Sequence, residues 1–201
     1  MTQGLDIDDE LWSRWRNEAY RRFVEDIEIG YVDPDIVPLI KLIFSKRSIF
    51  SISSCSGRVV AVDTTYPWVR EDASIIFKKH SPLTLNELIS IINTPIRYRC
   101  WIIVSGPILH IVAKSLESAT KVLNLARSCG FKHSGIISLR RDGIVLELIS
   151  GTWTSFLVKE LDTVLIDLKH AEKLLKTVNE ILEEGKRRLQ RLEDALKHAD
   201  L

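Results

Sequence analysis

The chain has almost no net charge and no long hydrophobic run. Its 28 basic and 27 acidic side chains leave a formal net charge of +1 at pH 7. A domain that attracts nucleic acid through its whole field is strongly basic, so any RNA contact must come from local clusters of Lys and Arg. No apolar segment approaches the roughly 20 residues of a transmembrane helix, and the acidic first ten residues hold no signal-peptide core. We therefore expect a cytoplasmic protein with no membrane partner.

Cysteine is also scarce. The three cysteines, Cys55, Cys100 and Cys129, are odd in number and show no C-x-x-C spacing. A disulfide framework needs paired cysteines, and a structural zinc site needs closely spaced ones. The sequence therefore predicts a reducing compartment and no metal site.

A glycine-rich Gly-x-Gly-x-x-Gly turn is missing as well, so a Rossmann-type cofactor site has no support. Hydrophobic periodicity predicts a mixture of helices and strands without regular alternation. The expected helices cover residues 9–29, 34–46, 84–92 and 115–129. The expected strands cover residues 49–54, 58–64, 73–78, 100–104, 108–112, 135–140, 144–149 and 155–160. The predicted fold class is α+β, with a mixed, mostly antiparallel sheet and embedded helices.

The C-terminal segment predicts one long helix over residues 163–199. Its apolar residues recur alternately four and three apart, which is a heptad seam. These residues are Val164, Leu168, Ala171, Leu175, Val178, Leu182, Gly185, Leu189, Leu192 and Leu196. We expect the N-terminal helix to pack on this seam, with a dimeric coiled coil as the alternative, so monomer and dimer both stay open. The chain is then a single domain over 1–201, with a β-rich body at about 47–161 and a helical element from 9–46 and 162–199.

Residues 51–58 form the most informative motif, Ser-Ile-Ser-Ser-Cys-Ser-Gly-Arg. It lies between two strand-like runs and combines hydroxyls, a glycine and a guanidinium. Such a turn can direct several hydrogen-bond donors at one anionic or polar ligand. A tight Ser/Gly hairpin explains the same residues about equally well. Gly57 is expected to supply a positive φ or a close approach.

The motif resembles the signature of the tRNA wybutosine-synthesizing protein 3 family. The resemblance extends over residues 12–198 and includes 109–111, 130–136 and the C-terminal helix with Asn179 and 185–189. It implies an S-adenosylmethionine-dependent methyltransferase that is not of the Rossmann type. The implied substrate is phenylalanine tRNA (tRNA-Phe), methylated at N4 of 7-(3-amino-3-carboxypropyl)-4-demethylwyosine beside the anticodon.

The resemblance also assigns expected roles. Methyl transfer from a sulfonium needs positioning and a base for the acceptor nitrogen. His110 is the first candidate base and Asp63 the second; a structural histidine and a turn-capping carboxylate are their ordinary alternatives. The cofactor is expected to contact Ser51, Ser53, Ser54, Cys55, Ser56, Gly57 and Arg58.

The tRNA is expected to meet local cations and polar groups. The candidates are Lys132, His133, Ser134, Lys79, Lys186 and Arg187, although most such residues in proteins form solvated surfaces. Tyr66 and Trp68 either stack on an exposed base or belong to a packed loop.

Two other classes of function remain open. One is a non-catalytic RNA-binding or scaffolding module of tRNA modification, which would not bind the cofactor. The other is a cysteine-dependent enzyme with Cys55 as nucleophile and Arg58 stabilising the thiolate.

Overall fold

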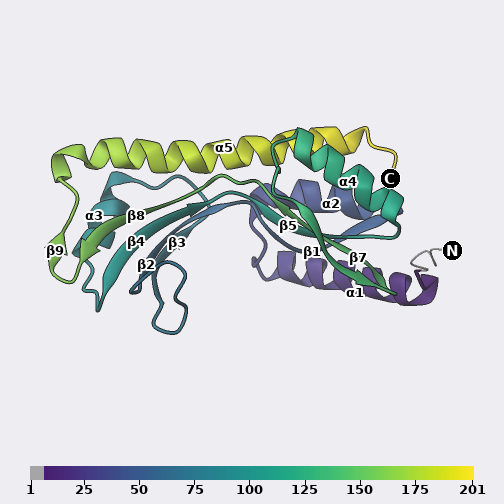
Figure 1. Cartoon of the computed structure of the whole chain (residues 1–201), viewed down its shortest axis with the longest axis horizontal. Helices are drawn as coiled ribbons and strands as arrows, with labels where there is room; N and C mark the ends of the chain where they lie inside the picture. Colours follow the sequence, from purple (N-terminus) through teal and green to yellow (C-terminus); the bar gives the residue numbers. More distant parts are fainter. Residues whose placement is uncertain (1–6) are drawn as a thin grey trace. The chain divides into compact units, whose positions relative to one another are not determined.

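The structure is a computed structural model that describes residues 7–201, apart from the side chain of Leu168. Its described part contains five α-helices, two short 3₁₀ helices and nine strands in two sheets (Figure 1). All strand pairs are antiparallel. The predicted α+β class, without a doubly wound parallel sheet, is therefore confirmed. No helix within residues 7–201 is long and apolar enough to cross a membrane.

Two compact units divide the chain. The first unit comprises the residues up to Ser56, Pro107–Gly151 and Arg187–Leu201. The second unit comprises Gly57–Gly106 and Thr152–Lys186. Each unit holds one sheet, and the long C-terminal helix contributes a part to each. The expectation of a single domain stays a prediction.

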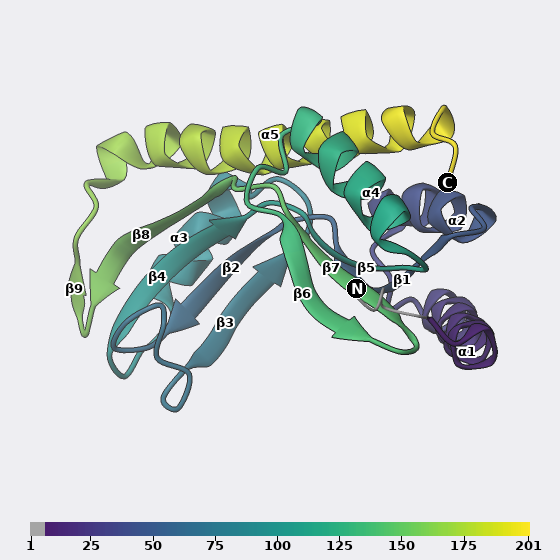
Figure 2. The ribbon, with the colours of Figure 1, turned by 45° about the vertical axis from the view of Figure 1, so that its right-hand side comes forward.

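The first unit contains a four-stranded sheet in the order β1-β5-β7-β6. Its elements are α1 (Asp9–Glu28), η1 (Pro34–Ile36), α2 (Val37–Ser45), β1 (Ile49–Cys55), β5 (Ile108–Ala113), α4 (Leu116–Ser128), β6 (Gly135–Arg140), β7 (Gly143–Ile149) and the C-terminal part of α5 (Ala171–Lys197). Figure 2 shows α4 and this part of α5 on one face of the sheet and α1 on the other. The fully buried Leu109, Ile111, Leu146 and Leu148 belong to this unit's core.

Aromatic contacts hold α1 in the first unit. The ring of Trp12 lies 4.8 Å from that of Phe50 on β1, and Phe23 stacks on Phe44 of α2 at 5.7 Å. The tryptophan- and phenylalanine-rich stripe of α1 therefore packs on β1 and α2. The expected packing of this stripe on the seam of the C-terminal helix was wrong.

The second unit contains a five-stranded sheet in the order β3-β2-β4-β8-β9. Its elements are β2 (Arg58–Asp63), β3 (Ser74–Lys79), α3 (Leu85–Asn93), β4 (Arg99–Ser105), β8 (Trp153–Glu160), β9 (Thr163–Val164), η2 (Leu168–His170) and the N-terminal part of α5. Along β4 buried residues alternate with half-buried ones, as expected for a sheet covered on one face. The buried set, including Ile102 and Val104, packs with Leu88 of α3 and Val178 of α5.

The long helix α5 begins later than predicted. It starts at Ala171 instead of 163, because Thr163–Val164 pairs with β8 as strand β9. The seam residues on α5 are buried or half-buried nonetheless, whereas Val164 on β9 is exposed. Ala171, Val178 and Leu182 lie in the core of the second unit, and Leu189, Leu192 and Leu196 lie in the core of the first. Leu168 was also expected on the seam, but its side chain is not among those that the structure describes.

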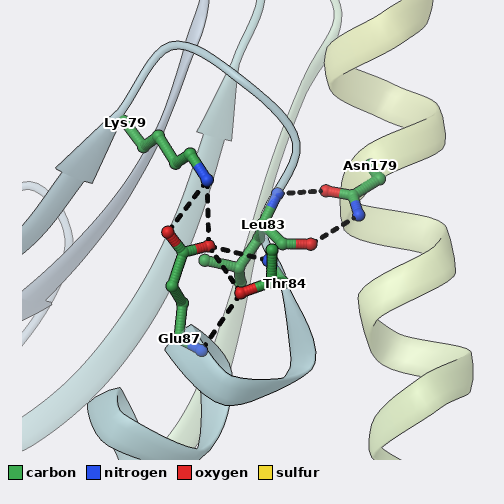
Figure 3. A network of polar contacts seen from close by, with 5 residues as sticks. All are labelled: Lys79, Leu83, Thr84, Glu87 and Asn179. Atoms are coloured by element: carbon green, nitrogen blue, oxygen red, sulfur yellow. Dashed lines mark hydrogen bonds and ion pairs between the residues drawn. The ribbon is translucent and has the colours of Figure 1, made fainter.

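A polar network fixes α3 and α5 in the second unit (Figure 3). Thr84 and Glu87 form a capping box at the start of α3. Glu87 also accepts two bonds from Lys79 Nζ, at 2.8 and 3.1 Å. The side-chain amide of Asn179 on α5 accepts from the N–H of Leu83 at 2.7 Å and donates to its carbonyl at 2.8 Å. Asn179 thus satisfies two backbone groups that precede α3.

Candidate active site

A row of four residues crosses the whole sheet of the first unit. Ser53 of β1 lies opposite His110 of β5, His110 opposite Glu147 of β7, and Glu147 opposite Gly135 of β6. Residues directly opposite in an antiparallel sheet point to the same face. The row therefore places a hydroxyl, an imidazole and a carboxylate side by side on one face.

The imidazole and the carboxylate of this row are hydrogen-bonded. His110 Nε2 lies 3.1 Å from Glu147 Oε1, and their side chains are 28% and 34% exposed. An ionised carboxylate only accepts hydrogen bonds, so a neutral His110 carries its proton on Nε2 and has a basic Nδ1. This is the arrangement in which a carboxylate orients a histidine for proton transfer. Sequence reasoning found His110 but missed Glu147, although Glu147 is the one charged residue of β7.

The serines of the motif have different surroundings. Ser53 is exposed, whereas Ser51 is buried and donates to the carbonyl of His110 at 3.4 Å. Ser56 is fully buried and its hydroxyl bonds to the carboxylate of Asp33. Ser51 and Ser56 therefore hold the motif in place, and Ser53 presents its hydroxyl beside His110. Ser54 and Cys55 are half-buried.

Gly57 and Arg58 begin the second unit. Gly57 has a φ of +99°, which confirms the predicted positive φ. A Cβ atom built there would lie 2.9 Å from the carbonyl oxygen of Ser105, so a side chain cannot be accommodated without a backbone shift. Arg58 lies opposite Ser105 and is exposed.

The carboxylate of Asp63, the second candidate base, is bonded to the protein backbone. Its carboxylate is nearly buried and accepts from the backbone N–H groups of Arg97 at 2.6 Å and Tyr98 at 2.9 Å. Both carboxylate oxygens are thus engaged, which agrees with the turn-capping alternative. Nearby, burial and then the charge of Asp63 raise the pKa of the Cys100 thiol to about 11.

The turn at 130–135 joins α4 to β6 in the first unit. Gly130, with a φ of +101°, follows the C-terminus of α4, and its carbonyl accepts from Arg188 of α5 at 3.2 Å. Lys132 and His133 are exposed at this turn. Ser134 is buried, donates to the carbonyl of Phe131 at 2.7 Å and accepts from Ile149 N–H at 3.1 Å. The turn therefore presents Lys132 and His133 to solvent on a scaffold that Ser134 fixes.

The remaining candidate cations differ in availability. Lys79 forms an ion pair with Glu87 at 2.8 Å. Lys186 is half-buried and Arg187 is exposed on α5. Among the side chains that the structure describes, no group of three or more His, Cys, Asp or Glu is arranged to hold a metal ion.

The two antiparallel sheets with their helices define an α+β protein outside the Rossmann-type methyltransferases, with a histidine–carboxylate pair on one sheet. The chain belongs to the family described as Methyltransferase TYW3, whose model matches residues 13–198. This assignment confirms the family that the sequence motifs indicated.

Named relatives agree with the family. A protein of Saccharolobus solfataricus is 37% identical over 92% of this chain and 90% of its own length, and one of Pyrococcus horikoshii is 33% identical over 93% and 95%. Both are named as tRNA(Phe) 7-((3-amino-3-carboxypropyl)-4-demethylwyosine(37)-N(4))-methyltransferases.

Solved structures show the same fold. One from Pyrococcus horikoshii, 33% identical, has a TM-score of 0.89 and covers 93% of this chain and 96% of its own. One from Aeropyrum pernix, 27% identical, has a TM-score of 0.75 and covers 84% of this chain and all of its own.

Proposed function

We propose that this chain is an S-adenosylmethionine-dependent methyltransferase acting on tRNA-Phe. Its substrate is 7-(3-amino-3-carboxypropyl)-4-demethylwyosine at position 37, and the product carries the new methyl group on N4, as the names of the relatives describe. The observation that supports a catalytic role is the His110–Glu147 pair at 3.1 Å, next to the exposed Ser53 of the family motif.

His110 acts as the general base in this proposal. Its Nδ1 accepts the proton that the acceptor nitrogen loses as it forms the new N–C bond. Glu147 holds the proton on Nε2, orients the ring and stabilises the imidazolium that results. Asp63 is less suited to this step because its two oxygens are bonded to backbone N–H groups.

The donor set of residues 51–58 fits the amino-acid end of the cofactor. Ser53 offers an exposed hydroxyl and Arg58 an exposed guanidinium, which pairs well with a carboxylate. Because Gly57 has no side chain, its backbone can lie close to the backbone of Ser105 and Gly106. When bound, S-adenosylmethionine supplies a methyl group on a positively charged sulfur. Ser51 and Ser56 contribute by holding the motif, since their hydroxyls bond to the protein.

Exposed basic and polar side chains of the first unit bind the tRNA backbone in this proposal. Lys132, His133 and Arg187 are exposed, and Arg188 ties the turn of Lys132 to α5. Phosphate contacts of this kind position the RNA without reading its sequence.

The cysteine-dependent alternative is not favoured. Cys55 lies opposite Ile108, whereas the candidate base His110 lies opposite Ser53 and Glu147. Displacement at a sulfonium needs no protein nucleophile, so the proposed transfer requires no thiolate.

The decisive experiment incubates tRNA-Phe carrying the unmethylated precursor with the protein and methyl-labelled S-adenosylmethionine. Mass analysis of the isolated position-37 nucleoside should show one added labelled methyl group. His110→Gln is the matched variant and should give little label. If the wild-type protein binds the cofactor measurably but transfers no label to the RNA, the proposed function is refuted.

A further inference from the structure

An aromatic stack lies exposed on the loop between β2 and β3 of the second unit. The rings of Tyr66 and Trp68 are nearly parallel, with centroids 4.9 Å apart and an interplanar angle of 10°. Trp68 is 76% exposed and Tyr66 is 44% exposed. Single exposed aromatic side chains are common, whereas a contiguous exposed cluster is typical of an interaction site.

The loop that carries this stack has a defined shape. Thr64 is fully buried, and its hydroxyl donates to Asp72 Oδ1 at 2.7 Å. The N–H of Val69 bonds to the carbonyl of Tyr66 at 3.0 Å and closes a turn around the two rings. The hydrogen bond from Thr64 lowers the pKa of Asp72, which favours the ionised carboxylate that accepts this bond. The rings are therefore presented by a preorganised loop, which reduces the entropy lost on binding.

A guanidinium is part of the same arrangement. The Cζ atom of Arg99 lies 5.0 Å from the centroid of the Tyr66 ring. Arg99 is fixed by Glu160 at 2.8 Å and by the carbonyl of Thr65 at 3.1 Å. The guanidinium of Arg99 thus lies near the ring of Tyr66, and Tyr66 in turn stacks on Trp68. The indole of Trp68 is the most exposed of the three groups.

We propose that Trp68, supported by Tyr66 and Arg99, is a stacking platform for an unpaired base of the RNA substrate. This inference rests on the proposed function and adds a binding residue to it. A flat, exposed indole matches the π-face of a base, and bases in RNA loops are free to stack on it. Bases inside a duplex are already stacked, so the platform selects unpaired nucleotides.

The loop carries no excess of positive charge. Residues 64–73 hold one cation, Arg70, and two carboxylates, Glu71 and Asp72, and Arg99 beside the loop is paired with Glu160. The loop therefore offers phosphates little electrostatic attraction. Binding at Trp68 is then carried by stacking, and its loss should leave the salt dependence of RNA binding unchanged. This separates the platform from the cationic surface around Lys132.

The test compares Trp68→Ala, Trp68→Phe and a control, Tyr31→Ala. Tyr31 is an exposed aromatic residue of the first unit, at 78% exposure. Dissociation constants are measured by anisotropy for a labelled anticodon stem-loop and for a fully paired RNA duplex, over a series of salt concentrations. Methyl transfer to full tRNA is measured in parallel, together with the thermal shift caused by S-adenosylmethionine.

Trp68→Ala should bind the stem-loop roughly ten- to a hundredfold more weakly, with the same salt slope and the same thermal shift. Trp68→Phe should recover most of the affinity for the stem-loop, and Tyr31→Ala should bind the stem-loop as the wild type does. The affinity for the paired duplex should be the same for all three variants and the wild type. If Trp68→Ala and the wild type bind the stem-loop with equal affinity, the platform is overturned. If the wild type also methylates tRNA, the proposed function stands without the platform. A weaker Trp68→Ala with an inactive wild type would instead support the platform and refute the proposed function. No stem-loop binding by the wild type would overturn the platform outright.

Discussion

The imidazole of His110 and the carboxylate of Glu147 meet across two neighbouring strands, with Nε2 and Oε1 3.1 Å apart. Neither group depends on a loop for its position, because both lie in a central pair of the four-stranded sheet. A proton acceptor in such a place keeps a fixed direction, which is what general-base catalysis requires.

The first prediction concerns this pair. His110→Gln should lower kcat by roughly 10²- to 10⁴-fold, since a neutral amide cannot take up the proton. Glu147→Gln should also lower kcat, and the double variant should be hardly worse than His110→Gln, because residues that act as a unit are not additive. Single-turnover rates would measure this, with Glu117→Gln on the exposed surface of α4 as control. Full activity of Glu147→Gln would reduce the pair to a structural contact.

A second prediction ranks two residues of the motif. Arg58→Ala should weaken S-adenosylmethionine binding roughly ten- to a hundredfold, because a charge-assisted hydrogen bond is lost. Cys55→Ser should keep substantial methyl transfer, since no thiolate takes part. Titration calorimetry and labelled-methyl assays test both, with Arg21→Ala on α1 as a charge-matched control. An inactive Cys55→Ser beside a normal Arg58→Ala would favour a thiol enzyme.

Reactivity of the three thiols gives a third prediction. Burial raises the pKa of Cys100 to about 11, so at pH 8 roughly one molecule in a thousand carries its thiolate. Cys129 is buried too, whereas Cys55 is half-buried. A thiol reagent should therefore modify Cys55 first in the native protein and all three residues after unfolding. Peptide mass mapping identifies the modified residue, and early labelling of Cys100 would contradict its buried position.

Much of the fold was predictable because local patterns agreed with the tertiary contacts. The strand expected at 100–104 and the helices expected at 84–92 and 115–129 are present as β4, α3 and α4, and Thr84 and Ser115 cap the two helices. The start of α5 was not predictable from the heptad pattern, because Val164 is drawn into a strand by its pairing with Lys159. The side chain of Asp167, which accepts from the N–H of Lys169, was the overlooked sign of a later start.

The candidate site was only partly predictable. His110 and the motif at 51–58 stood out by composition, but the partner of His110 depends on the register between β5 and β7. The pairing register between two strands cannot be derived from their sequence pattern, so nothing identified Glu147 as the partner of His110. The burial of Ser56 against Asp33 was likewise invisible, since these residues lie 23 positions apart.

The last prediction uses the pH dependence of the Glu87 network. The hydrogen bond from Lys79, followed by the N–H of Thr84, lowers the pKa of Glu87 below its ordinary 4.5. The ionised form is thus favoured in the folded state. Its contribution to stability is complete above the unfolded pKa and is lost as pH falls through the folded pKa.

Glu87→Gln should therefore destabilise the protein at pH 7, and its deficit should shrink as the pH drops below 4.5. Glutamine still serves in a capping box, so the variant mainly removes the ion pair with Lys79. Urea unfolding at several pH values measures the difference, and Glu180→Gln on the exposed surface of α5 should change little throughout. A deficit that stays constant across this range would mean that the charge of Glu87 does not stabilise the fold, and that Thr84 and Asn179 hold α3 in place without it.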